Sequence, residues 1–390
     1  MARFSPRQLV LTCRRDRAEN PGPFLLVTSR HLTDSSGCAM SPLQLLTLVV
    51  PTRNCPIMLN RTIGYLARIG FRGRVLILDS SDGVARQMNL VTVTRHGAEL
   101  DIGLLHFDKT YLQKCRAGMG RVVTPYSALC ADDAFIFSDA LGRLVEFLEL
   151  NSGYSAAAGI RVSLSREPNG KCYAMPGRPI LNDSPVVRFR DFASNPFPLG
   201  HAVQRTDGLI EAFDVAATST DYEATPVFAE IVLNQMPVML GRIHFEPLAA
   251  HVRVDRGRNP TVMPIVFDAE RCATQFQAFR EGLAEQLEIA GATIDHSFVM
   301  VDRYYGDLWD GGARAASRRL GVFGRCRRET VRHYRQLVNL IRADHLLQRR
   351  RLRTADLKGQ RPEWLLMHDL LAHSGPEPIL IDAAAQRKAA

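Results

Sequence analysis

Two apolar runs separated by one helical segment constrain the fold more than any other feature of this chain. The run LQLLTLVV covers residues 43–50, and the run RVLILD covers residues 74–79. Between them, apolar side chains recur at the spacing of one helix face, at Leu59, Ile63 and Leu66. A strand, a helix and a second strand in this order form a right-handed crossover between parallel strands. The sequence therefore predicts an α/β fold with a parallel sheet.

The same alternation of apolar runs and helical periods continues beyond the second run. We expect further strands over residues 91–97, 102–107, 124–130 and 154–164, and helices over residues 108–120, 138–151 and 225–236. Ser138 is the expected N-cap of the helix at whose start it lies. Residues 168–200 are rich in Pro, Asn and Gly, which predicts a long loop.

After this α/β part the sequence changes character. Helical periods cover residues 269–290 and 327–353, which predicts a mainly helical C-terminal segment. The chain is long enough to bury one large domain with extensions. We expect three parts, which are a loosely packed N-terminal extension (1–43), an α/β domain (44–255) and a helical, Arg-rich extension (256–390).

Positive charge is concentrated near the C-terminus. The 49 Lys and Arg outnumber the 40 Asp and Glu, and residues 314–353 hold 13 Arg against the acids Glu329 and Asp344. We expect weak peripheral contact of this tract with an anionic membrane surface, and a solvated helix face is the alternative. Nucleic acid is not an expected partner, because Tyr334 stands nearly alone as an aromatic residue on which bases could stack.

The cysteines and the short apolar runs indicate a cytoplasmic protein, at most peripheral at the inner membrane surface. The eight Cys form no C-x-x-C pair and no cluster with histidines, which is typical of reduced thiols without a structural zinc. No apolar run approaches the roughly 20 residues of a membrane span. The N-terminus lacks the apolar core of a secretory signal.

Three polar clusters follow predicted strands. They are PTRN at residues 51–54, DSSD at residues 79–82, and the adjacent acids Asp132 and Asp133. Ligands of open α/β sheets bind beyond the carboxyl ends of the strands, so these clusters predict a ligand site. Unrelated polar loops at strand ends are the alternative.

The adjacent acids lie between two apolar runs, where two like charges need compensation. Carboxylate oxygens suit Mg²⁺ or Mn²⁺, with a phosphate group completing the coordination shell. An acidic pair at a helix N-terminus, favoured by the helix dipole, is the alternative. The chain has no dinucleotide-binding glycine motif after the first strand, no P-loop, no G-x-S-x-G and no H-E-x-x-H, which argues against the enzyme classes that use them.

Stretches around the clusters resemble the family 2-type glycosyltransferases, which have the GT-A fold. They are TLVVPTRNCPIMLNRTIGYLARIGF, VLILDSSD and TPYSALCADDAFIFSDALGRLVEFLELNSGYSAAAG, and the last is similar to a bacterial subgroup of glycosyltransferase-domain proteins. The resemblance covers about residues 45–253. It implies a GT-A-like (Rossmann-like), mostly parallel sheet flanked by helices. It also implies a nucleotide-diphosphate-sugar donor, Mg²⁺ or Mn²⁺, and inverting transfer to a hydroxyl of a glycan, lipid or protein acceptor.

The resemblance further implies roles for residues of the three clusters. Asp132 and Asp133 would contact the metal and the diphosphate. The residues that would hold the base and the ribose are Pro51, Thr52, Arg53, Asn54 and Asp79.

Four residues outside the clusters receive roles by position in the same resemblance. Lys114 would approach the phosphates, with a solvated helix lysine as the alternative. Glu230 would be the catalytic base, with Asp133 as the next candidate and a first-turn glutamate that complements the helix dipole as the alternative. His251 and Arg253 would be late metal or phosphate contacts, with a structural role at a strand end as the alternative for both.

One position departs from the pattern of the family. Ala134 follows the two acids, where the common pattern has a further acid. A protein that binds a nucleotide sugar without transferring it is therefore a second hypothesis. A protein that binds anionic surfaces through its Arg-rich C-terminus is a third.

Overall fold

The computed structural model describes residues 41–165, 172–255, 269–319 and 350–351, together with Glu363, Leu366 and Met367. Most of the predicted N-terminal extension, most of the predicted helix over 327–353 and most of the Arg-rich tract lie outside these residues.

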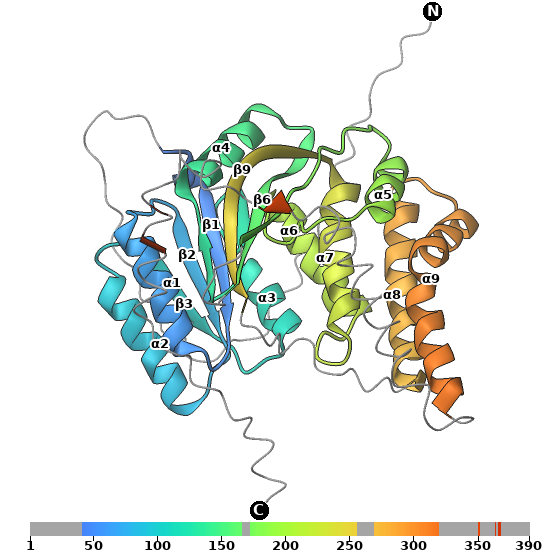
Figure 1. The fold of residues 1–390 in the computed structure, drawn as a ribbon, viewed down its shortest axis with the longest axis horizontal. Helices are drawn as coiled ribbons and strands as arrows, with labels where there is room; N and C mark the ends of the chain where they lie inside the picture. The colour runs from blue at the N-terminus through green and yellow to red at the C-terminus, as the bar shows by residue number, and fades with distance from the viewer. Residues whose placement is uncertain are drawn as a thin grey trace, which may run out of the picture.

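Within the described residues, ten strands form one mixed sheet whose first part is parallel (Figure 1). β1 (Leu46–Thr52) pairs in parallel with β2 (Arg74–Asp79) on one side and with β4 (Tyr126–Leu129) on the other. β3 (Asp101–His106) continues the parallel part beside β2. The predicted crossover from β1 through α1 (Pro56–Arg68) to β2 is therefore confirmed, and with it the α/β fold.

The second part of the sheet is built around two long strands. β6 (Tyr154–Ser165) pairs in parallel with β9 (Arg242–Asp255) along most of its length. Short antiparallel strands connect this pair with β4 and extend it. They are β5 (Ala134–Ile136), β7 (Cys172–Met175), β8 (Val203–Arg205) and β10 (Arg350–Arg351).

Helices cover both faces of the sheet, and none of those described is long and apolar enough to cross a membrane (Figure 1). A short 3-10 helix (Pro42–Leu45) precedes β1. Besides α1, the helices are α2 (Gly83–His96), α3 (Tyr111–Met119), α4 (Ser138–Leu150), α5 (Pro185–Ser194), α6 (Thr206–Ser219), α7 (Pro226–Leu240), α8 (Ala269–Ile289) and α9 (Ile294–Arg319).

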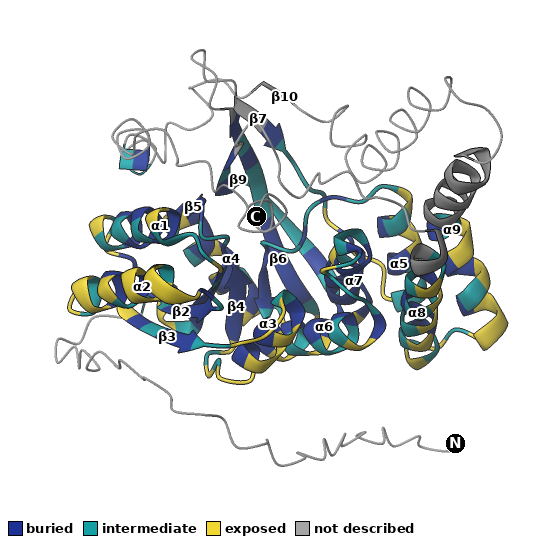
Figure 2. Cartoon of the chain, turned by 90° about the horizontal axis from the view of Figure 1, so that it is seen from below, coloured by how far each residue is buried: buried dark blue, intermediate teal, exposed yellow. Residues whose placement is uncertain are grey.

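The parallel strands are buried on both faces, as their dark colour in Figure 2 shows. Along β1, Leu48 and Val50 belong to an apolar cluster shared with α1 and α4. Val49, which lies between them, belongs to a second cluster shared with α3, α6 and α7. Because successive side chains of a strand point to opposite faces, this two-sided burial explains why β1 is a continuous apolar run.

The helices that follow residue 255 extend the second cluster. Phe279 of α8 stacks on Phe228 of α7 with ring centroids 4.8 Å apart. Leu283 and Leu287 are fully buried in the same cluster, as their helical spacing predicts. α8 therefore packs against α6 and α7 through its apolar face.

Two expectations about secondary structure are wrong, and one helix was not expected. Residues 91–97 belong mostly to α2, because Val93 packs into the core and this contact outweighs the strand preference of a Val- and Thr-rich run. Residues 168–200 contain β7 and α5, and the Ser184 hydroxyl caps α5 by accepting a hydrogen bond from the N–H of Val187. The helix α6 was not expected at all.

The first turn of α4 is capped by a residue from far along the chain. Glu363 Oε1 accepts a hydrogen bond of 3.0 Å from the backbone N–H of Ser138. Leu366 and Met367 pack into the same cluster as α1 and α4. The N-cap is Phe137 and Ser138 is the first helical residue, so the expected Ser138 cap is wrong. The acceptor that satisfies this N–H comes from Glu363 instead.

Replacing Glu363 by Ala should lower the free energy of unfolding by about 1 kcal/mol, because the helix loses a cap acceptor. Glu363→Gln keeps a side-chain oxygen and should lose less. Urea denaturation of the full chain measures both, with the exposed Glu146→Ala on α4 as the control. Equal stability of Glu363→Ala and the wild type would contradict the capping role.

Candidate active site

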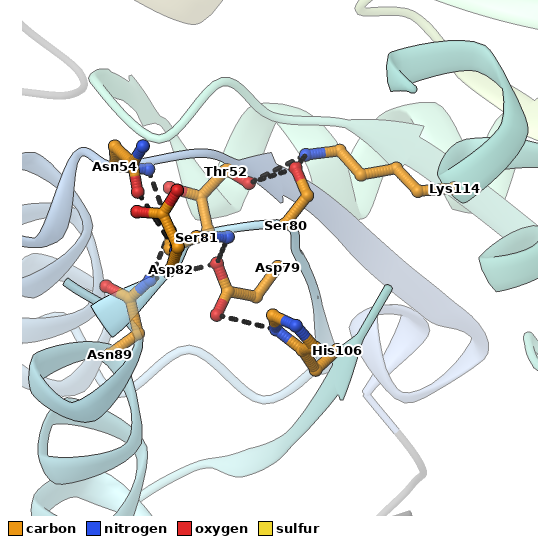
Figure 3. A network of polar contacts seen from close by, with 9 residues as sticks. All are labelled: Thr52, Asn54, Asp79, Ser80, Ser81, Asp82, Asn89, His106 and Lys114. Atoms are coloured by element: carbon orange, nitrogen blue, oxygen red, sulfur yellow. Dashed lines mark hydrogen bonds and ion pairs between the residues drawn. The ribbon is translucent and has the colours of Figure 1, made fainter. Parts of the chain in front are cut away.

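The loops after β1 and β2 are tied together by backbone and side-chain hydrogen bonds (Figure 3). The N–H of Ser80 donates to the carbonyl oxygen of Thr52 at 3.1 Å. The N–H of Asn54 donates to Ser81 Oγ at 2.7 Å, and the N–H of Asp82 donates to Asn54 Oδ1 at 3.2 Å. Asn54 has a φ of 53°, a left-handed conformation that Asn tolerates better than most residues. The first two polar clusters therefore form one surface at the carboxyl edge of the sheet.

Asp79 holds this surface from beneath. Its side chain is fully buried, and Oδ1 accepts hydrogen bonds from the N–H of Ser81 at 2.8 Å and from Asn89 Nδ2 at 3.1 Å. His106 Nδ1 lies 3.5 Å from Oδ2. These contacts satisfy a buried carboxylate within the protein. In this structure Asp79 positions the loop, and the exposed residues beside it are Arg53 and Asp82.

Lys114 of α3 is buried at the junction of the same two loops. Its Nζ donates to the carbonyl oxygen of Thr52 at 2.6 Å and to Ser80 Oγ at 2.8 Å. Burial lowers the pKa of Lys114, and the carboxylates of Asp79 and Asp132 act in the opposite direction. The solvated-lysine alternative is therefore wrong, since this ammonium lies inside the site and is fixed there.

The third cluster joins the first through Asp132. Thr52 Oγ1 donates to Asp132 Oδ2 at 2.7 Å, and Thr62 Oγ1 of α1 donates to the carbonyl oxygen of Asp132 at 2.8 Å. Asp133 is 6% exposed. Burial, together with the charges of both acids, raises the pKa of the Cys130 thiol to about 12. The structure thus brings all three polar clusters to one edge of the sheet.

The adjacent carboxylates have the oxygen donors that a hard cation prefers. Among the described residues, however, no three His, Cys, Asp or Glu side chains converge on a possible metal position. Asp132, Asp133 and His251 therefore do not form a three-ligand set. A cation beside the two carboxylates would need further oxygens from a bound phosphate group or from water.

His251 of β9 stacks on His201, which precedes β8. The ring centroids are 4.2 Å apart, and His201 Nδ1 donates to the carbonyl oxygen of Leu129 at 3.0 Å. Burial lowers the pKa of His201 to about 3, and it lowers the pKa of His251 well below its ordinary value. Arg161 and Arg253 add to both effects, so both imidazoles are neutral near pH 7.

Glu230 is exposed on α7 and lies in electrostatic range of an aromatic pair. Tyr111 and Tyr222 stack with ring centroids 4.4 Å apart. Burial raises the pKa of Tyr222, the negative charge of Glu230 adds to this effect, and Arg253 opposes it. Glu230 and Arg253 therefore both lie near Tyr222.

Sequence reasoning gave no role to Arg161, His201 or Tyr222. The sequence did contain one indication of a polar face. Polar and apolar residues alternate in RVSL (161–164) and HVRV (251–254). Such alternation predicts a strand with one polar face. His201 and Tyr222 lie outside strands and helices, where no periodicity marks a residue as part of a site.

The sequence matches no family model and no curated protein. Many solved structures are distantly similar, including the following two. TarS 1–349 from S. aureus in complex with UDP-GlcNAc is 13% identical over 66% of this chain and 71% of that chain, with a TM-score of 0.45. The mannosyltransferase PcManGT from Pyrobaculum calidifontis, in complex with GDP-Man and Mn²⁺, is 12% identical over 85% and 87%, with a TM-score of 0.41.

The neutral state of the stacked histidines should make stability depend on pH. The unfolded chain binds protons near pH 6.5, whereas the folded imidazoles resist protonation until a much lower pH. Their contribution to stability is therefore fully present above pH 6.5 and is lost as the pH falls. Each histidine adds a slope of up to about 1.4 kcal/mol per pH unit.

His251→Phe keeps an aromatic ring that can stack on His201. It should remove the contribution of one histidine to the dependence of stability on pH. Urea denaturation of the wild type and the variant between about pH 7 and pH 4 measures the difference. The exposed His296→Phe on α9 is the matched control and should leave the slope unchanged. Parallel curves for the wild type and His251→Phe would contradict a buried, neutral His251.

Proposed function

We propose that this protein is a glycosyltransferase that uses a nucleotide-diphosphate-sugar donor. The observation that carries the proposal is the convergence of three polar clusters at the carboxyl edge of β1, β2 and β4, where Thr52 contacts Asp132. This edge is where open α/β sheets bind nucleotides. The stretches that form it are also those that resemble the family 2-type glycosyltransferases.

The donor would lie across the loops after β1 and β2. Pro51, Thr52, Arg53 and Asn54 would hold the base and the ribose, on the surface that Asp79 supports from beneath. The Lys114 ammonium uses two of its three donors on Thr52 and Ser80. Its charge would favour the diphosphate at this junction.

The resemblance implies Mg²⁺ or Mn²⁺ at Asp132 and Asp133, and these carboxylates fit a hard cation that shares its shell with phosphate oxygens. When bound there, the metal would supply positive charge against the departing diphosphate. His251 is not part of this proposal, since its ring packs on His201 and no three-ligand set forms among the described residues.

Glu230 is the proposed catalytic base, with Asp133 as the next candidate. The base would accept the proton of the acceptor hydroxyl while the acceptor oxygen bonds to the anomeric carbon and the bond to the diphosphate breaks. A single displacement of this kind inverts the configuration at that carbon. This role is supported by Tyr222, which is in electrostatic range of Glu230 and also of Arg253, the cross-strand neighbour of Ala134 next to the two acids.

A nucleotide-sugar-binding protein without transfer is the second proposal. It is favoured by Ala134, which is fully buried where the family pattern has an acid. Donor binding that persists without any transfer or hydrolysis would support this second proposal over the first.

UDP-, GDP- or dTDP-sugars should raise the melting temperature of the full chain, because a ligand that binds only the folded state stabilises it. One nucleotide should act more strongly than the others, and Mn²⁺ should increase its effect. Asp132→Asn should abolish the part of the effect that depends on Mn²⁺. Glu146→Gln on the outer face of α4 is the control. No shift with any nucleotide sugar would contradict the proposed function.

Glu230→Gln should reduce kcat by about 10²-fold or more while leaving donor affinity nearly unchanged, because the carboxylate acts mainly in the transition state. Turnover with the donor found in the screen, measured as release of the nucleoside diphosphate, gives kcat, and calorimetry gives donor affinity. The exposed Glu285→Gln on α8 is the matched control. A normal kcat for Glu230→Gln would transfer the base role to Asp133.

A further inference from the structure

The paired strands β6 and β9 present a row of polar side chains on one face. In their parallel register Arg161 lies beside His251, and Ser163 lies beside Arg253. The residues that alternate with them along the two strands are buried in the apolar cluster on the opposite face. They are Val162, Leu164, Val252 and Val254. We name the polar row the cationic stripe, and its members are Arg161, Ser163, His251 and Arg253.

The cationic stripe lies next to the carboxylates of the candidate active site. Arg253 is the cross-strand neighbour of Ala134, the residue that follows Asp133. His251 stacks on His201, which bonds to the carbonyl oxygen of Leu129 at the end of β4. Toward α7, Arg253 acts on Tyr222, as Glu230 does. The stripe therefore lies beside the acidic segment, and Tyr222 is in electrostatic range of both Arg253 and Glu230.

Hydrogen-bonding capacity remains unused at two members of the stripe, His251 and Arg253. Both ring nitrogens of His251 are buried and have no hydrogen-bond partner in the described part of the chain. The Arg253 guanidinium is half-buried and makes no hydrogen bond or ion pair with any described residue. Ala134 beside it offers no charge, whereas an acid at that position would neutralise Arg253. Buried polar groups are rarely left unsatisfied, so this pattern indicates that a ligand completes it.

The charge of the stripe selects the kind of ligand. Arg161 and Arg253 both lower the pKa values of His201 and His251, which shows that their positive charges reach the same small volume. A guanidinium binds phosphate oxygens through two parallel N–H donors. A neutral imidazole adds one N–H donor without adding charge.

We propose that the cationic stripe binds a phosphate group of the acceptor, so that the acceptor of this enzyme is a phosphorylated molecule. The inference rests on the proposed glycosyltransferase function. The acceptor is favoured over the donor because the proposed donor surface, with Lys114 for the diphosphate, lies at the loops after β1 and β2, whereas the stripe lies on β6 and β9. An acceptor phosphate held there would bring a nearby hydroxyl toward the proposed base.

Binding of inorganic phosphate to the full chain tests the stripe directly. Calorimetry should detect phosphate binding to the wild type, and Arg253→Gln should weaken it at least tenfold. Arg161→Gln should weaken it as well, and Arg253→Lys should fall between Arg253→Gln and the wild type because it keeps the charge but not the planar donors. The exposed Arg95→Gln on α2 is the matched control. A folded Arg253→Gln that binds phosphate as the wild type does would overturn the proposal.

A second experiment distinguishes an acceptor phosphate from the donor diphosphate as the ligand of the stripe. With the nucleoside diphosphate identified in the donor screen at saturation, phosphate should still bind, and Arg253→Gln should keep its affinity for the nucleotide. The opposite result would be that phosphate and the nucleoside diphosphate compete and that Arg253→Gln lowers the affinity for both equally. That result would assign the stripe to the donor diphosphate and overturn the acceptor role. If phosphate binds at the stripe but no nucleotide sugar binds, the proposed function fails, and the acceptor role fails with it.

Discussion

The parallel pairing of β1 with both β2 and β4 is the constraint on which the rest of the site depends. It places Thr52 beside Asp79 and carries the chain from Leu129 to Asp132, whose carboxylate accepts a hydrogen bond from Thr52. Because β1 is buried on both faces, a shift of one residue would exchange the side chains that meet the two apolar clusters. The register is therefore strongly specified, and the polar loops can meet only at this edge.

Charge buried at this edge is compensated locally. Asp79 accepts hydrogen bonds from its own loop and from α2, and Lys114 donates two hydrogen bonds to the loops after β1 and β2. An unpaired charge at such depth would cost several kcal/mol. The same contacts order the loop backbone before a ligand arrives, which reduces the entropy lost on binding.

The other side of the site is built differently. Its acids and its cationic stripe come from β4, β6 and β9, and the stacked pair of His201 and His251 lies among them. The segment after Asp133 is supported from outside the local sequence, because Tyr65 donates to the carbonyl oxygen of Ile136 and Glu363 accepts from Ser138. The C-terminal part of the chain thus contributes to the framework that holds the proposed metal carboxylates.

By itself, the sequence determined the crossover from β1 to β2, the helical face of α8 and the edge at which the polar clusters meet. An element that is buried on one or both faces has apolar residues at a regular spacing in the sequence, and the carboxyl ends of parallel strands lie at the same edge of the sheet. Only the tertiary structure decided that residues 91–97 are helical, that Asp79 faces inward, and that His251 stacks on His201. Glu363 caps α4 across 225 residues. Such contacts join residues whose separation is set by the packing of whole elements, so no local pattern of apolar and polar residues encodes them.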